Sequence, residues 1–87
     1  MNKYLLTIHN PKVRELLSQY PIHRDILENG YTVKATNEKE ARLEASKKYN
    51  ILELTDADPS MNLTDHPDIN KYGDLWTNTE YSSIKRI

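Results

Sequence analysis

Acidic side chains and an aromatic residue gather in the C-terminal part of this 87-residue chain. Between residues 53 and 80, seven Asp or Glu stand against a single basic residue, Lys71, and the only tryptophan of the chain, Trp76, lies in the same stretch. An aromatic side chain on an acidic, loop-rich surface is typical of contact with a basic protein partner. The predicted partner-binding residues are Asp56, Asp58, Asp65, Asp68, Asp74 and Trp76. In the alternative interpretation, Trp76 covers the end of the core and the acidic residues only maintain solubility.

The same stretch has some features of a metal site. From Asp56 to Thr64, oxygen-bearing side chains occupy alternate positions, as in a calcium-binding loop. Met61 stands where such a loop needs glycine, however, and Pro67 stands where it needs glutamate. The three histidines of the chain have no paired-ligand spacing, and cysteine is absent. We therefore expect no metal and no cofactor.

Catalytic patterns are missing as well. Without cysteine there is no thiolate nucleophile, and no serine lies in a glycine-flanked elbow. Two glycines are too few for a phosphate-binding loop. The sequence therefore predicts a protein that is not an enzyme.

Nucleic-acid binding by the basic N-terminal half is the alternative function. Residues 1–50 carry nine Lys or Arg and six Asp or Glu, whereas residues 51–87 carry three and seven, for a net charge of −1. The basic candidates are Lys3, Lys12, Arg14, Arg24, Lys34, Lys39, Arg42, Lys47 and Lys48. The tyrosines that would stack on bases are Tyr4, Tyr20, Tyr31 and Tyr49. The acidic residues alternate with the basic ones, which is typical of a mixed solvated surface.

Hydrophobic periodicity predicts the helices and strands that position these residues. Alternating apolar residues predict strands over residues 3–8 and 31–36, a third strand over 51–55 with Leu52 and Leu54 inward, and a last edge strand over 81–87. Asn10 followed by Pro11 predicts the start of a helix that ends before Pro21, and a short helical segment should end at Asn29 and Gly30.

A third helix should begin after residue 36. Asn37 has the position of an N-cap, and Glu40 follows at the spacing of a capping box. Ala41, Ala45 and Tyr49 share one face of this helix, so we expect them to pack against the sheet. Residues 56–73 hold Asp-Pro and His-Pro pairs and scattered apolar residues, which is typical of an irregular loop with a short turn of structure inside it.

Residues 31–58 resemble the DpnD/PcfM-like family of small proteins associated with bacterial mobile elements. The resemblance rests on Val33, Ala35 and Thr36, on the Glu40-Ala41 pair, on Tyr49 eight residues later, and then on Leu54 and Asp58. In that family, a strand runs into a helix closed by tyrosine, and a hydrophobic strand follows. The chain departs from the family after Tyr49, where Asn50 and Ile51 leave no room for the usual glycine-containing turn. The resemblance implies a mobile-element setting, and it carries no established activity to transfer.

Together these observations predict one small α+β domain over residues 1–87, with an acidic, loop-rich part over 56–80. We expect a small, mainly antiparallel sheet of three or four strands with two or three helices on one face. No apolar run is long enough to cross a bilayer and the start lacks a signal peptide, so we expect a cytoplasmic protein without membrane contact. The predicted function is a non-enzymatic protein-interaction module, of phage or mobile-element origin, that binds and modulates a host protein. Its expected partner is a basic protein.

Overall fold

Three strands form an antiparallel sheet in the order β2-β1-β3. The computed structural model describes residues 1–57 and 67–87, and of Pro67 and Asp68 it describes the backbone alone. Strand β1 spans Asn2–Ile8, β2 spans Tyr31–Ala35 and β3 spans Ser82–Arg86. Tyr4 of the central strand lies opposite Val33 on one side and Arg86 on the other. The first and last strands of the chain are therefore neighbours, and β3 is the edge strand predicted from the sequence.

Backbone hydrogen bonds show which groups face each edge of the sheet. The amide of Ile87 donates to the Lys3 carbonyl at 2.9 Å, and the amide of His9 donates to the Tyr81 carbonyl at 3.1 Å. In an antiparallel pair, the N–H and C=O of one residue point to the same neighbouring strand. The odd-numbered residues of β1 therefore bond to β3 and the even-numbered ones to β2. By the register, Val33 turns its backbone groups toward β1, whereas Thr32 and Lys34 turn theirs to the outer edge of β2.

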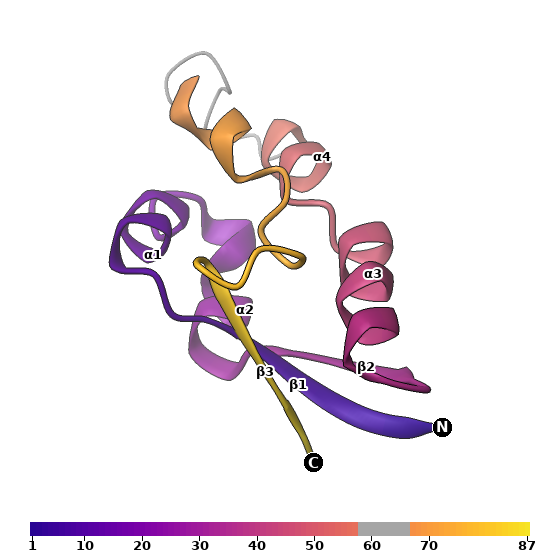
Figure 1. Ribbon diagram of the computed structural model, residues 1–87. Coiled ribbons are helices and arrows are strands. Elements are labelled where there is room, and N and C mark those ends of the chain that lie inside the picture. The colour runs from indigo at the N-terminus through magenta and orange to yellow at the C-terminus, as the bar shows by residue number, and fades with distance from the viewer. Residues whose placement is uncertain (58–66) are drawn as a thin grey trace.

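Helices cover one face of this sheet (Figure 1). Helix α1 spans Pro11–Leu17, the 3-10 helix η1 spans Pro21–His23, α2 spans Arg24–Asn29 and α3 spans Glu38–Lys48. The side chain of Asn10 accepts hydrogen bonds from the amides of Lys12 and Val13, and Asn37 accepts one from the Glu40 amide at 2.9 Å. Both predicted N-caps are confirmed, and each satisfies amides that the first helical turn leaves unpaired.

Gly30 connects α2 to β2 and must be glycine. Its φ is +76°, a left-handed conformation that side chains disfavour. A Cβ atom at this position would lie 2.7 Å from the Leu6 carbonyl oxygen. The predicted stop at Asn29 and Gly30 is therefore confirmed, and the tight turn brings β2 directly beside β1.

The predicted strand over residues 51–55 is wrong, because this segment is a helix. Helix α4 spans Ile51–Asp56, and its cap is Asn50, whose side chain accepts a hydrogen bond from the Leu52 amide at 3.0 Å. The buried residues are Ile51 and Thr55, one helical turn apart, and not the predicted pair Leu52 and Leu54. Farther along, a 3-10 helix, η3, spans Pro67–Tyr72 within the predicted irregular stretch.

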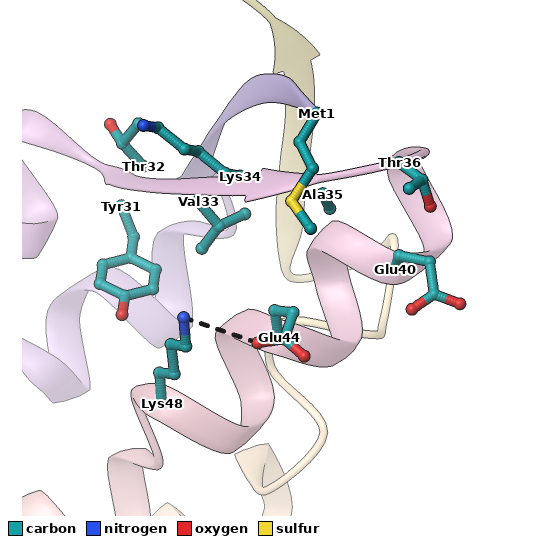
Figure 2. Close-up of a pocket in the computed structure, with 10 residues that line it drawn as sticks. All are labelled: Met1, Tyr31, Thr32, Val33, Lys34, Ala35, Thr36, Glu40, Glu44 and Lys48. Atoms are coloured by element: carbon teal, nitrogen blue, oxygen red, sulfur yellow. Dashed lines mark ion pairs between the residues drawn. The ribbon is translucent and has the colours of Figure 1, made fainter.

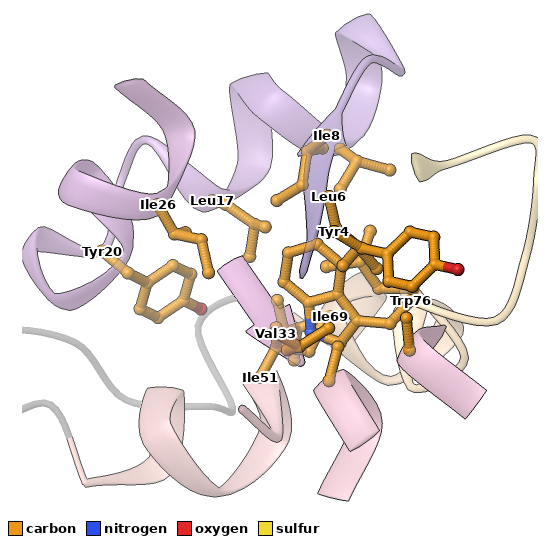
Figure 3. Packing of buried hydrophobic residues seen from close by; sticks show 14 of the residues in the cluster. Tyr4, Leu6, Ile8, Leu17, Tyr20, Ile26, Val33, Ile51, Ile69 and Trp76 are labelled. Atoms are coloured by element: carbon orange, nitrogen blue, oxygen red, sulfur yellow. The ribbon is translucent and has the colours of Figure 1, made fainter. Parts of the chain in front are cut away.

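The core lies between the sheet and the helices, with the indole of Trp76 among side chains of β1 and Ile69 (Figure 3). On the central strand β1, the side chains of Tyr4, Leu6 and Ile8 face the helices, and all three are buried. Ala41 and Ala45 of α3 are fully buried, as predicted, while Arg42 is half-buried and Leu43 is exposed. The three-stranded antiparallel sheet with helices on one face confirms the predicted α+β fold. Among the described residues, no helix combines the length and the apolar character needed to cross a membrane.

Candidate functional site

The predicted acidic surface is only partly described. Asp58 and Asp65 lie outside the described residues, and for Asp68 the structure describes the backbone alone. Asp56 is exposed at the end of α4, and Asp74 is exposed in the turns before β3. Asp74 has a local role, because its carboxylate accepts a hydrogen bond from the Asn78 side chain at 3.2 Å.

Trp76 belongs to the core. Only 2% of its surface is exposed, and its indole N–H donates to the Tyr49 carbonyl at 2.9 Å. The rings of Tyr31 and Tyr49 lie 5.9 and 6.0 Å from it, centre to centre. The alternative interpretation of the sequence, in which Trp76 covers the end of the core, agrees with this placement. In this conformation the indole is not presented to a partner.

Two basic residues of the N-terminal half, Arg14 and Arg42, make hydrogen bonds within the fold. Arg14 donates to the carbonyls of Ile8 and Leu27, and Arg42 donates to the carbonyls of Trp76 and Ser82. Both guanidinium groups therefore stabilise the fold through hydrogen bonds to backbone carbonyls. Of the tyrosines considered for base stacking, Tyr4 and Tyr20 are buried in the core, and Tyr31 and Tyr49 are half-buried on the helix side of the sheet.

Tyr49 and His23 form a polar contact inside the helical layer. The Tyr49 hydroxyl lies 2.8 Å from Nδ1 of His23, and the Thr55 hydroxyl lies 2.5 Å from Nε2 of the same ring. Burial raises the pKa of Tyr49 to about 12, with smaller contributions from the negative charge of Asp25 and from Tyr31. The contact joins η1, the end of α3 and helix α4. It accounts for the helical placement of Thr55, and no pattern in the sequence indicates it.

A groove of about 470 Å³ lies between the outer edge of β2 and helix α3 (Figure 2). Its lining residues come from β2 and its ends, from α3 and from the first residue of the chain: Met1, Tyr31, Thr32, Val33, Lys34, Ala35, Thr36, Glu40, Glu44 and Lys48. The side chains of Tyr31 and Val33 point from the strand toward α3, and those of Glu44 and Lys48 project from the helix (Figure 2). This concave surface combines backbone groups, apolar side chains and charge.

The groove offers three kinds of contact. Its upper wall is the edge of β2, where Thr32 and Lys34 direct their backbone N–H and C=O groups outward. Its helical wall carries Glu40 and Glu44, and Glu44 pairs with Lys48 at 3.6 Å. In the described part of the chain, Glu40 makes no salt bridge. The sequence predicted both elements but not this groove, because the outer position of β2 depends on the strand order.

Within the described residues, no group of three or more His, Cys, Asp or Glu is placed to hold a metal ion. No family model, curated protein or solved structure matches the chain.

Proposed function

We propose that the protein is a non-enzymatic cytoplasmic protein-interaction module that binds an extended segment of a partner at the edge of β2. The observation that carries this proposal is the row of outward backbone groups of Thr32 and Lys34, which borders the groove beside α3. An extended peptide added to a sheet edge gains main-chain hydrogen bonds there, and pockets for alternate side chains give specificity. The groove supplies both features.

Alternation along the added segment determines which of its side chains meet the groove. Side chains on the helix side would pack on Tyr31 and Val33 and approach Glu40. The helical wall of the groove carries two acidic residues, Glu40 and Glu44, and one basic residue, Lys48. Lys48 forms a salt bridge with Glu44. A segment with an apolar residue next to a lysine or arginine therefore fits, in agreement with the basic partner expected from the sequence.

Lys34 adds specificity for the side chains on the other face of the added partner segment. Its side chain lies on the open face of the sheet, and a lysine on an edge strand disfavours indiscriminate strand pairing. An acidic side chain placed beside Lys34 in the added strand offsets this cost, because opposite charges across a strand pair attract. The partner segment is thus expected to alternate acidic residues on one face with apolar and basic residues on the other.

A proline at position 32 tests the proposal. Because the Thr32 amide points to the outer edge, Thr32→Pro removes a donor that strand addition needs and no ladder bond to β1. Peptides selected against the native protein from a random display library should lose binding to Thr32→Pro, while circular dichroism shows a retained fold. In the native protein, the bound peptide should slow hydrogen exchange of the Thr32 and Lys34 amides.

Arg86→Pro is the matched control, because Arg86 directs its backbone to the outer edge of β3 on the other side of the sheet. This variant should bind the selected peptides as the native protein does. Peptides that bind both proline variants equally, or that leave the exchange of the two amides unchanged, would show that strand addition at β2 is not the binding mode.

A mobile-element setting and the modulation of a host protein belong to this proposal. Their support is the resemblance of residues 31–58 to the DpnD/PcfM-like family. The absence of cysteine supports the cytoplasmic setting.

A further inference from the structure

The open face of the sheet, opposite the helices, carries basic charge. None of the three strands contains Asp or Glu. The exposed side chains on this face are those of Lys3, Thr7, Thr32, Lys34, Ser83 and Lys85, and Leu5 is half-buried among them. Three lysines from three strands, far apart in the sequence, thus share one surface. The sequence placed Lys85 in the acidic half, and only the sheet brings it to the others.

Two of these lysines oppose each other directly. Lys3 lies opposite Lys34 in the register of β1 and β2. Because the backbone of Lys3 bonds toward β3, this is a non-hydrogen-bonded pair, in which the Cα atoms are about 4.5 Å apart and the side chains are close. Like charges directly opposite each other destabilise a strand pair. In the described part of the chain none of the three lysines forms a salt bridge, so this repulsion has no compensation there.

Protection of the sheet edges does not account for this arrangement. Lysine on an edge strand prevents unwanted strand pairing, which is a sufficient reason for Lys34 and Lys85. Lys3, however, lies on the central strand, which has no edge to protect. A cation placed opposite Lys34 on that strand is therefore better explained by a ligand that carries several negative charges.

We infer that the open face binds the phosphate backbone of nucleic acid through Lys3, Lys34 and Lys85. The hydroxyl group of Thr7 adds a hydrogen-bond donor beside the lysines, whereas the hydroxyl of Ser83, opposite it on β3, already lies 2.6 Å from Nδ1 of His9. No aromatic side chain of the three strands lies on this face, since Tyr4 and Tyr31 point to the helix side. Base stacking is thus absent, and recognition is electrostatic and independent of base sequence.

The number of lysines sets the expected strength. Each phosphate contact contributes about −0.9 to the slope of log K against log salt on duplex DNA, so three contacts predict a slope of about −3. Binding of this kind has dissociation constants of roughly 10⁻⁴ to 10⁻⁶ M and weakens steeply as salt rises. This function goes beyond the peptide groove: Lys34 lines the groove as well, but Lys3 and Lys85 do not.

The test removes the three charges together. Fluorescence anisotropy at low salt would compare the native protein with the triple variant Lys3→Gln, Lys34→Gln and Lys85→Gln. The probes are a labelled mixed-sequence DNA duplex and a single strand of the same sequence. The triple variant should lose affinity by about tenfold or more and its salt slope should fall toward zero, whichever probe binds more tightly. Its fold should persist, since the substitution relieves a repulsion.

A second triple variant gives the matched control. Lys12→Gln, Lys39→Gln and Lys47→Gln remove the same charge from exposed positions on α1 and α3. This variant should keep most of the affinity. Equal losses of DNA affinity in both triple variants would show that binding depends on the net charge of the protein and not on the open face. Absence of DNA binding by the native protein would also overturn the inference. Displacement of the DNA by polyglutamate at equal charge would assign the face to acidic proteins instead.

Discussion

At the scale of single residues, Tyr49 makes more contacts than its half-buried position suggests. Its hydroxyl meets His23, its carbonyl accepts the Trp76 indole N–H, and its ring lies 5.4 Å from that of Tyr31. Each of these partners comes from a different element. The sequence indicated a core position for Tyr49 from its helical spacing alone, and the polar contacts show why a tyrosine, and not a phenylalanine, occupies the end of α3.

Tyr49 should make stability sensitive to high pH. Its pKa rises from 10.0 to about 12 on folding. As pH increases, the unfolded chain loses this proton first, so the contribution of Tyr49 to the free energy of unfolding is complete below pH 10 and declines between about 10 and 12. Ultraviolet difference titration of the folded protein should show a late-titrating tyrosine, which Tyr49→Phe should remove. In Tyr81→Phe the late step should remain, and its loss there would contradict the assignment.

At the scale of elements, α3 approaches the sheet closely because its inner face is small. Ala41 and Ala45 are both fully buried, and they lie against the strands where a longer side chain would hold the helix away. Figure 1 shows α3 standing over β2, and this close approach forms the helical wall of the groove. The geometry of the groove therefore depends on two alanines that do not line it.

Replacing Ala45 with leucine should overpack this contact. Ala45→Leu adds volume to a fully buried site, which should lower the free energy of unfolding by about 1 to 3 kcal/mol. Denaturant melts monitored by circular dichroism measure the change. Lys47→Leu adds a leucine at an exposed position of the same helix, and its stability should stay within about 0.5 kcal/mol of the native protein. A variant Ala45→Leu as stable as the native protein would show that α3 does not pack closely.

At the scale of the whole molecule, Arg42 connects the two halves of the chain. From the middle of α3 its guanidinium donates to the Trp76 carbonyl at 2.9 Å, to the Ser82 hydroxyl at 3.1 Å and to the Ser82 carbonyl at 3.3 Å. These bonds tie the turns after η3 and the start of β3 to the N-terminal half. β3 then closes the sheet by pairing with β1, so residues from both ends of the chain complete one core.

Removing the Arg42 head group should weaken this connection. Arg42→Met keeps most of the aliphatic stem and leaves the two carbonyls without their donor, so it should cost about 1.5 to 3 kcal/mol of stability. Chemical denaturation measures the loss, and hydrogen exchange should increase first in β3. Lys39→Met, at an exposed position on the same helix, serves as the control and should change little. Equal stability of both variants would show that the Arg42 contacts contribute nothing.

The sequence by itself determined most of the helices and strands, because their signals are local. Asn10 and Asn37 cap helices, Gly30 stops one, and alternation marks β1 and β2 over a few consecutive residues. The segment after Asn50 was misassigned because alternating apolar residues over five positions fit a strand or a helix equally well. The contact between Thr55 and His23, 32 residues apart, belongs to the helical form, and no local pattern reveals it.

Only the tertiary structure decided where the proposed binding surfaces lie. Trp76 is buried in the core and not exposed on the predicted acidic surface, since the burial of an aromatic side chain depends on what the rest of the chain places around it. The outward backbone of β2 and the shared face of Lys3, Lys34 and Lys85 both follow from the strand order β2-β1-β3. Strand order joins residues that are distant in the chain, so periodicity and capping, which act over a few residues, carry no information about it.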